Sequence, residues 1–141
     1  MRVFLDANIL FSAAKSDGAV RALLRMLLDR GHDVVADAYV LAEARRNLAA
    51  KGPEALRVLE ALAAHLSVVA TAVPEVASGH ATGELAWLPE KDRPVLLAAI
   101  GLRCDVLVTA DRTHFGAGSG RVYGGVVIHS PRSLAEGLLR R

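Results

Sequence analysis

Four acidic residues stand far apart in the sequence at positions from which their carboxylates could meet, namely Asp6, Glu43, Asp92 and Asp111. Carboxylates that crowd together repel one another, and burying one without a partner costs several kcal/mol. Mg²⁺ and Mn²⁺ relieve this repulsion because they prefer carboxylate oxygens and water as ligands. A cation held in this way can activate water and stabilise the charge that develops on a phosphodiester. The four acids therefore predict metal-dependent nuclease chemistry, and the lack of Cys or paired His ligands argues against zinc.

Two of these acids follow predicted β-strands. Val3–Leu5 is a short apolar run that ends on Asp6, and Asp111 lies two residues after a strand predicted over Asp105–Thr109. In an open parallel sheet, ligands bind beyond the carboxyl ends of the strands, near the point where the strand order reverses. If the first strand is central, the two strands are neighbours at that point, and the two carboxylates lie close together.

The other two acids fall on predicted helices. Glu43 lies on the margin of the apolar stripe of a helix that Asp37 caps and that runs to about Ala50. Asp92 opens a very apolar helix that reaches Leu102, and the amide end of this helix should face the carboxyl edge of the sheet. Each of the four acids also has an ordinary interpretation as a strand end, solvated helix residue, helix cap or turn residue. Spacing alone therefore leaves both interpretations open.

The rest of the pattern predicts alternating strands and helices. Further helices are expected over Ala19–Arg30, over Pro53–His65 and after Ser130-Pro131, and further strands over Asp33–Ala36, Ser67–Thr71 and Val126–Ile128. A loop carrying Asp17-Gly18 is expected after Asp6, a helix or looser segment over Val73–Leu85, and a glycine-rich loop over residues 116–120. This order predicts an α/β fold with a mainly parallel sheet and helices on both faces, as one domain over residues 1–141.

Composition limits the class of protein. The chain has 141 residues, of which 52% are hydrophobic, so it is long enough to bury a core and is not disordered. A net charge of +2 is too small to indicate a nucleic-acid partner by itself. The single Cys104 excludes an internal disulfide framework. Because Asp6 interrupts the first apolar run and no uncharged apolar run reaches about 18 residues, we expect a cytoplasmic protein without a signal peptide or membrane span.

Four stretches of the sequence carry recognisable motifs. They are DANILFSA from Asp6, KDRPVLLAAI from Lys91, VLVTADRTHF from Val106 and GGVVIHSPRSLAEGL from Gly124. Together they resemble the PIN-domain family, and in particular bacterial PIN proteins regarded as toxin components of toxin–antitoxin systems. The first three are similar to the family's Asp-x-Asn opening, its third acidic motif and its strand ending in Thr-x-Asp. The match covers essentially the whole chain, while Glu43 rests on a helix pattern.

The resemblance implies a flavodoxin-like, three-layer α/β/α domain that binds Mg²⁺ or Mn²⁺ and cleaves RNA. The acids that it implies as catalytic residues and metal ligands are Asp6, Glu43, Asp92 and Asp111. Asn8 and Thr109 correspond to polar residues that hold the first and last acids and a water on the metal. In the implied mechanism, water activated by the metal attacks in line and leaves a 5′-phosphate without a covalent intermediate.

The resemblance also bears on partners and on the number of metal ions. Relatives often pair with a small antitoxin and often form dimers, so the expected partners are RNA, an antitoxin and a second copy of the chain. Some PIN proteins carry an additional acid beside the fourth one. The corresponding stretch here, Arg112–Phe115, has none. The four acids thus support the binding of one metal ion, whereas this stretch offers no acid to hold a second ion tightly.

Several other polar residues are secondary candidates. Ser12 could hydrogen-bond a water on the metal or a phosphate, and Arg112 could contact a substrate phosphate. Arg45 and Arg46 follow Glu43 and could bind an RNA backbone. His114 could assist proton transfer, although a loop His paired with backbone is the ordinary interpretation. The ordinary interpretation of Ser12 is a hydroxyl that helps to start a turn. Arg112 is then a solvated loop residue, and Arg45 and Arg46 belong to a solvated helix face.

Two other classes of protein share features with this sequence. A non-catalytic RNA- or protein-binding PIN module would be expected to lack the acids, and all four are present. A phosphotransfer domain also has an Asp after its first strand. The haloacid-dehalogenase type needs Asp-x-Asp, where this chain has Asp6-Ala7-Asn8, and the receiver type needs a Lys after the last strands that this chain does not place there. The endoribonuclease is the leading interpretation.

Overall fold

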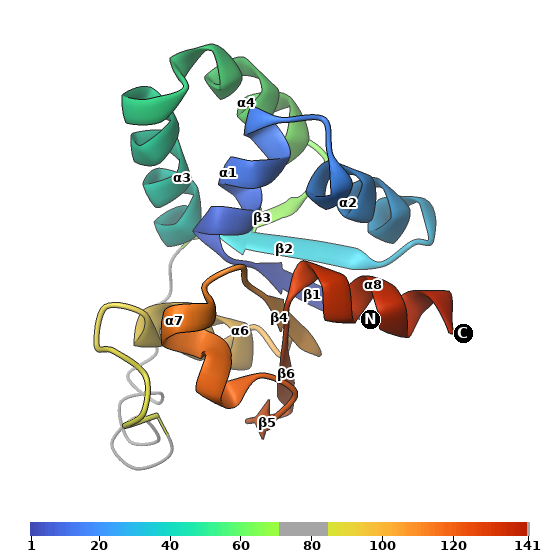
Figure 1. The fold of residues 1–141 in the computed structure, drawn as a ribbon, viewed down its shortest axis with the longest axis vertical. Coiled ribbons are helices and arrows are strands. Elements are labelled where there is room, and N and C mark those ends of the chain that lie inside the picture. The colour runs from blue at the N-terminus through green and yellow to red at the C-terminus, as the bar shows by residue number, and fades with distance from the viewer. Residues whose placement is uncertain (71–84, 141) are drawn as a thin grey trace.

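The computed structural model describes residues 1–70 and 85–140, and at its centre is one mixed β-sheet (Figure 1). Its strands are β1 (Arg2–Leu5), β2 (Asp33–Asp37), β3 (Ser67–Val69), β4 (Val106–Val108), β5 (Val122–Tyr123) and β6 (Val126–His129). They lie in the order β3-β2-β1-β4-β6-β5, and every neighbouring pair is parallel except β5 with β6. β1 is central, which is the condition under which the sequence places β1 and β4 side by side, and the strand order reverses between these two strands.

Helices cover both faces of the sheet. They are α1 (Ala7–Lys15), α2 (Ala19–Asp29), α3 (Ala38–Lys51), α4 (Leu56–Ala63), α6 (Arg93–Gly101), α7 (Arg112–Phe115) and α8 (Pro131–Leu139), with 3₁₀ turns at Pro53–Ala55 and Gly116–Gly118. In Figure 1, α1 to α4 lie on one side of β2 and α6 lies on the other. Helix α8 packs against β6 and α2. This is the predicted three-layer α/β/α arrangement.

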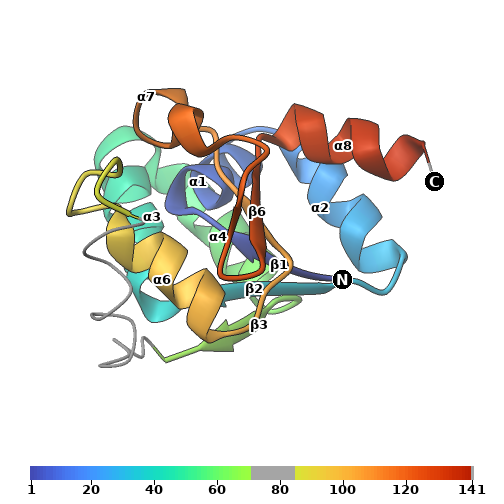
Figure 2. The same ribbon diagram turned by 90° about the horizontal axis from the view of Figure 1, so that it is seen from below.

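Both views place α3, α6 and α7 toward one end of the molecule and α2 and α8 toward the other (Figure 2). Strand β2 points toward the end that holds α3, and β1 and β4 run parallel to it. The carboxyl ends of the central strands therefore face the helices that carry Glu43 and Asp92. All four predicted acids belong to elements that meet at this edge.

The two central strands are buried on both faces. Val3, Phe4 and Leu5 of β1 are 0% exposed, and the three residues of β4 are buried as well. Strands of this kind have no polar face, which explains why both appear in the sequence as continuous apolar runs. Their burial fixes the residues directly after them, because a shift of one residue would turn polar side chains into the core.

Helix α1 corrects the predicted loop between Asp6 and Ala19. The Asp6 carboxylate accepts a hydrogen bond from the Ala7 N–H and caps the helix, and the Asp6 carbonyl accepts from the N–H groups of Ile9 and Leu10. The buried residues of α1 are Ala7, Ile9, Leu10, Ala13 and Ala14. This spacing of three and four residues gives the helix an apolar face against the core. The loop carrying Asp17-Gly18 begins only after Lys15.

The segment between β4 and β6 is also more ordered than a glycine-rich loop. Residues 112–115 form a helical turn, and part of the predicted loop at residues 116–120 is the 3₁₀ turn. The short strand β5, which the sequence pattern did not indicate, pairs with β6 through a turn at Gly124 and Gly125. Both glycines have positive φ, 55° and 85°. Glycine adopts such angles without the strain that a side chain adds.

Two further predicted segments extend beyond the residues that the structure describes. The segment over Val73–Leu85 lies outside them except for its last residue. The predicted strand over Ser67–Thr71 is observed at Ser67–Val69, and Thr71 also lies outside. None of the helices in residues 1–70 and 85–140 combines the length and apolar character required to cross a membrane.

The cap of α3 offers a stability test. The Asp37 carboxylate, 2% exposed, accepts from the Val40 N–H at 3.0 Å. Asp37→Ala is expected to lower the free energy of unfolding by about 1 kcal/mol, because it removes the cap of the helix that carries Glu43. Asp37→Asn should be at least as stable as the native protein, since its amide oxygen can cap and burial raises the pKa of the Asp37 carboxyl. Urea unfolding measures both, and native stability in Asp37→Ala would contradict the role of the cap.

Candidate active site

Asp6 lies at the centre of the carboxyl edge of the sheet. Its N–H donates to the Val108 carbonyl at 3.0 Å, so the ends of β1 and β4 remain paired beyond the last strand residues. One carboxylate oxygen, Oδ1, accepts from the Ala7 N–H at 2.7 Å, and the other, Oδ2, accepts from the Thr109 hydroxyl at 2.7 Å. The side chain is 6% exposed. Helix α1 and the end of β4 together fix the orientation of this carboxylate.

Asn8 and Thr109 join the two chain segments that carry Asp6 and Asp111. The Asn8 amide nitrogen lies 3.3 Å from both Asp6 Oδ2 and Thr109 Oγ1, and its amide oxygen accepts from the Ala110 N–H at 2.9 Å. Thr109 Oγ1 in turn accepts from the Asp111 N–H at 3.1 Å. One hydroxyl and one amide thus hold the first and last acids of the site, which agrees with the positions that the sequence motifs give them.

Glu43 and Asp92 act electrostatically on the Asp6 carboxylate. The pKa of Asp6 is raised from 3.8 to about 6, first by burial and then by the negative charges of Glu43 and Asp92. The hydrogen bonds from Thr109 and Ala7 act in the opposite direction. A buried carboxylate whose neighbours are also acidic is stabilised by a cation, and carboxylate oxygens are the ligands that Mg²⁺ and Mn²⁺ prefer. The donor set fits such an ion.

Glu43 lies at the edge of the buried face of α3, as predicted. Its neighbours Val40, Leu41, Ala44 and Leu48 are buried, and Glu43 itself is half-buried. The pKa of Tyr39 is raised by burial and by the charges of Glu43, Asp92 and Asp6. The Tyr39 hydroxyl donates to the Lys91 carbonyl at 3.1 Å, which links the start of α3 to the residue before Asp92. Tyr39 was not among the sequence candidates.

Asp92 and Asp111 meet at the ring of His114. Asp111 caps α7 by accepting from the His114 N–H at 3.0 Å, and its Oδ2 lies 2.8 Å from His114 Nδ1. Asp92 Oδ2 lies 2.9 Å from the same nitrogen. Asp92 precedes α6 without making a side-chain cap, so its carboxylate is available to the site. The interpretation of His114 as a loop residue paired with backbone is wrong, because its ring lies beside two carboxylates.

The secondary candidates differ in exposure and in their contacts. Ser12 is half-buried in α1, and Arg112 and Arg46 are exposed. Arg45 makes a two-point ion pair with Glu60 of α4, with distances of 2.7 and 3.2 Å. This pairing stabilises the charged form of the guanidinium and raises the pKa of Arg45. Arg45 thus contacts α4, and roles for Arg45, Ser12, Arg46 and Arg112 in substrate binding stay predictions.

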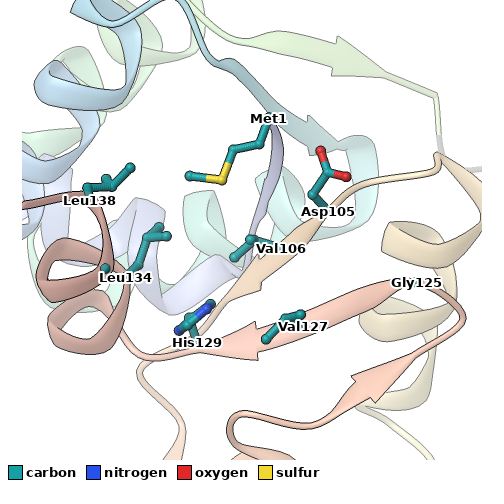
Figure 3. A pocket seen from close by; sticks show the side chains of 9 residues that line it. Met1, Asp105, Val106, Gly125, Val127, His129, Leu134 and Leu138 are labelled. Atoms are coloured by element: carbon teal, nitrogen blue, oxygen red, sulfur yellow. The ribbon is translucent and has the colours of Figure 1, made fainter. Parts of the chain in front are cut away.

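The acids do not line the cavity shown in Figure 3. That cavity, of about 470 Å³, lies between α8 and the sheet, and Met1, Val106, His129 and Leu134 are among the residues that line it. A much smaller hollow of about 30 Å³ borders Thr109, Asp111 and Arg112.

Fold and site together define an open, mainly parallel α/β domain whose polar residues gather where ligands of such sheets bind. The sequence matches the PIN domain family over residues 2–113, which is most of the chain. The chain therefore belongs to the PIN-domain family, as its motifs predict.

Several solved structures share this fold. VapBC2 from Rickettsia felis, bound to a DNA fragment from its promoter, has a TM-score of 0.68 at 16% identity and covers 92% of this chain and 98% of that one. VapBC-1 from nontypeable Haemophilus influenzae has a TM-score of 0.61 at 14% identity, covering 94% and 99%. VapC20 from Mycobacterium tuberculosis, a sarcin–ricin-loop-cleaving toxin, has a TM-score of 0.57 at 14% identity, covering 82% and 95%. No curated protein sequence is a significant match.

Proposed function

We propose that this protein is an endoribonuclease that depends on Mg²⁺ or Mn²⁺. The observation that carries the proposal is the environment of Asp6. Its buried carboxylate lies within the electrostatic influence of Glu43 and Asp92, and Thr109 connects it to Asp111. A divalent cation would relieve the repulsion among acids at this edge of the sheet, and their place at the strand switch point, where ligands of such sheets bind, supports a catalytic role.

The residues of the site would divide the work as follows. A divalent ion, when bound, supplies Lewis acidity toward the phosphodiester and lowers the pKa of water. The four acids would hold that ion, and Thr109 and Asn8 fix the Asp6 carboxylate, so that little reorganisation would be needed when the ion binds. Arg112, exposed directly after Asp111, is a candidate for contact with a substrate phosphate.

We also propose that the protein acts in a toxin–antitoxin pair. The support comes from the fold, which it shares with the two VapBC structures. VapC20, which has the same fold, is described as cleaving the sarcin–ricin loop, and this supports RNA as the substrate class. A small antitoxin and a second copy of the chain are the proposed protein partners.

Cleavage of RNA with and without metal tests the activity. The purified protein is expected to cut RNA with Mg²⁺ or Mn²⁺, to stop when EDTA is added and to recover when the metal is restored. Asp6→Asn, purified in the same way, controls for contaminating nucleases. Asp29→Asn, a change of an exposed acid at the end of α2, should cut like the native protein. Binding of RNA without cleavage in any metal would instead support the non-catalytic module.

A further inference from the structure

We propose that His114 Nδ1 is a metal ligand, and that with Asp92 and Asp111 it forms a mixed nitrogen and oxygen site which favours Mn²⁺ over Mg²⁺. The three side chains each offer one ligand atom, and these atoms all lie within 4.8 Å of one another. The site rests on the proposed metal-dependent function, and it assigns a ligand where the sequence lacks the additional acid of some PIN proteins.

The separation of the atoms is the first argument. Ligands at about 2.1 Å from an octahedral cation, at right angles to each other, are about 3 Å apart. His114 Nδ1 lies 2.9 Å from Asp92 Oδ2 and 2.8 Å from Asp111 Oδ2. Both separations are those of neighbouring ligands around one ion.

The direction of the contacts is the second argument. Although the oxygens are close enough for hydrogen bonds, His114 Nδ1 and Asp92 Oδ2 have no hydrogen-bond partner of acceptable geometry, and both atoms are buried. A ring N–H that held either acid would point at its oxygen. Both oxygens instead lie away from the direction in which an N–H bond at Nδ1 would point. Two buried polar atoms that lie close together without a hydrogen bond are costly unless a third group, such as a cation, contacts both of them.

Local structure explains how the ring reaches this position. Asp111 caps α7 by binding the His114 N–H, which brings the two side chains to the same side of one helical turn. Asp92 directly precedes α6, as its N-cap residue, and makes no cap hydrogen bond with its side chain. Helix α7 is too short to provide a site by itself. It serves to present the imidazole to carboxylates that other elements hold.

The chemistry of the donor set determines which metal is preferred. Imidazole suits transition metals, whereas Mg²⁺ prefers oxygen ligands and water. Replacing an acid by His in such a set removes one negative charge and adds a nitrogen donor. Affinity for Mn²⁺ should therefore exceed affinity for Mg²⁺ by more than in an all-oxygen site.

Pulsed electron paramagnetic resonance of Mn²⁺ bound to the RNA-free protein tests the ligand directly. The native protein is expected to give the modulation of a directly coordinated imidazole nitrogen. His114→Asn should lose this signal and bind Mn²⁺ about 10-fold more weakly by calorimetry. The matched control His65→Asn, a change of an exposed His before β3, should keep both. In His114→Asp, an all-oxygen site, the ratio of Mn²⁺ to Mg²⁺ affinity should fall.

The outcomes separate this site from the nuclease function. Bound Mn²⁺ without a nitrogen signal in the native protein, or no Mn²⁺ binding at all, would overturn the assignment even if RNA is cleaved. If Mn²⁺ binds without a nitrogen signal, His114 is only a neighbour of the two acids and not a ligand. A nitrogen signal that depends on His114, in a protein that does not cut RNA, would leave the site in place and remove the proposed activity.

Discussion

Asp6→Asn is expected to lower RNA cleavage at least about 100-fold, since loss of even the supporting groups around a metal typically costs 10- to 100-fold. The same change should stabilise the metal-free protein at neutral pH. A pKa raised from 3.8 to about 6 corresponds to about 3 kcal/mol of unfavourable charge in the folded state. The amide loses part of the hydrogen bonding to Thr109, so a net gain of about 1–2 kcal/mol is expected.

The gain should depend on pH in a defined direction. Between pH 3.8 and about 6, the folded protein retains the Asp6 proton that the unfolded chain has released. Because the unfolded state then binds fewer protons, the free energy of unfolding of the native protein falls as pH rises through this window. Asp6→Asn lacks this titration. Its advantage in stability should be absent below pH 3.8 and complete above pH 6.

Urea unfolding in EDTA at four pH values, for the native protein, Asp6→Asn and Asp29→Asn, measures this difference. Mg²⁺ or Mn²⁺ at neutral pH should reverse the order, because the ion stabilises only proteins that bind it in the folded state. Equal pH dependence in the native protein and Asp6→Asn would mean that the Asp6 carboxylate is not strained by burial. The account of the site as a cluster in need of a cation would then be wrong.

The central part of the site could be predicted because its elements leave strong local signals. A strand buried on both faces is a continuous apolar run, and a polar residue that follows it must lie at the edge of the sheet. Asp6 and Asp111 satisfy this condition, so both their strands follow from the pattern, whereas the central place of β1 is given by the structure. Glu43 could be placed on the margin of α3 by the same kind of argument, from the period of an amphipathic helix.

What could not be predicted depends on pairings between distant residues or on one side chain with two roles. Asp92 and His114 are 22 positions apart, and only the spacing of three between Asp111 and His114 is visible in the sequence. The ion pair of Arg45 with Glu60 likewise depends on how α3 and α4 pack. The sequence motif marks Asp6 as a site residue, and nothing in it indicates that the same carboxylate also caps α1.

Thr109 holds Asp6 and Asp111 in position relative to each other. For RNA cleavage, its hydroxyl should therefore matter more than its volume. Thr109→Val keeps the shape of this buried side chain, which is 5% exposed, but removes the donor to Asp6 and the acceptor of the Asp111 N–H. Cleavage is expected to fall about 10- to 100-fold, which is the usual cost of losing a group that orients metal ligands.

Measurements on metal binding distinguish this positioning role from a general loss of stability. In Thr109→Val, Mn²⁺ affinity should fall, and the pKa of Asp6 should rise further, because the hydrogen bond from Thr109 now lowers it. Thr109→Ser retains the hydroxyl and should restore both affinity and cleavage, although it removes a buried methyl group and is the less well packed of the two variants. Activity in Thr109→Val equal to that of the native protein would show that helix α1 and the strand ends hold Asp6 and Asp111 without this hydroxyl. If instead Thr109→Ser failed as completely as Thr109→Val, packing around the methyl group rather than hydrogen bonding would position the acids.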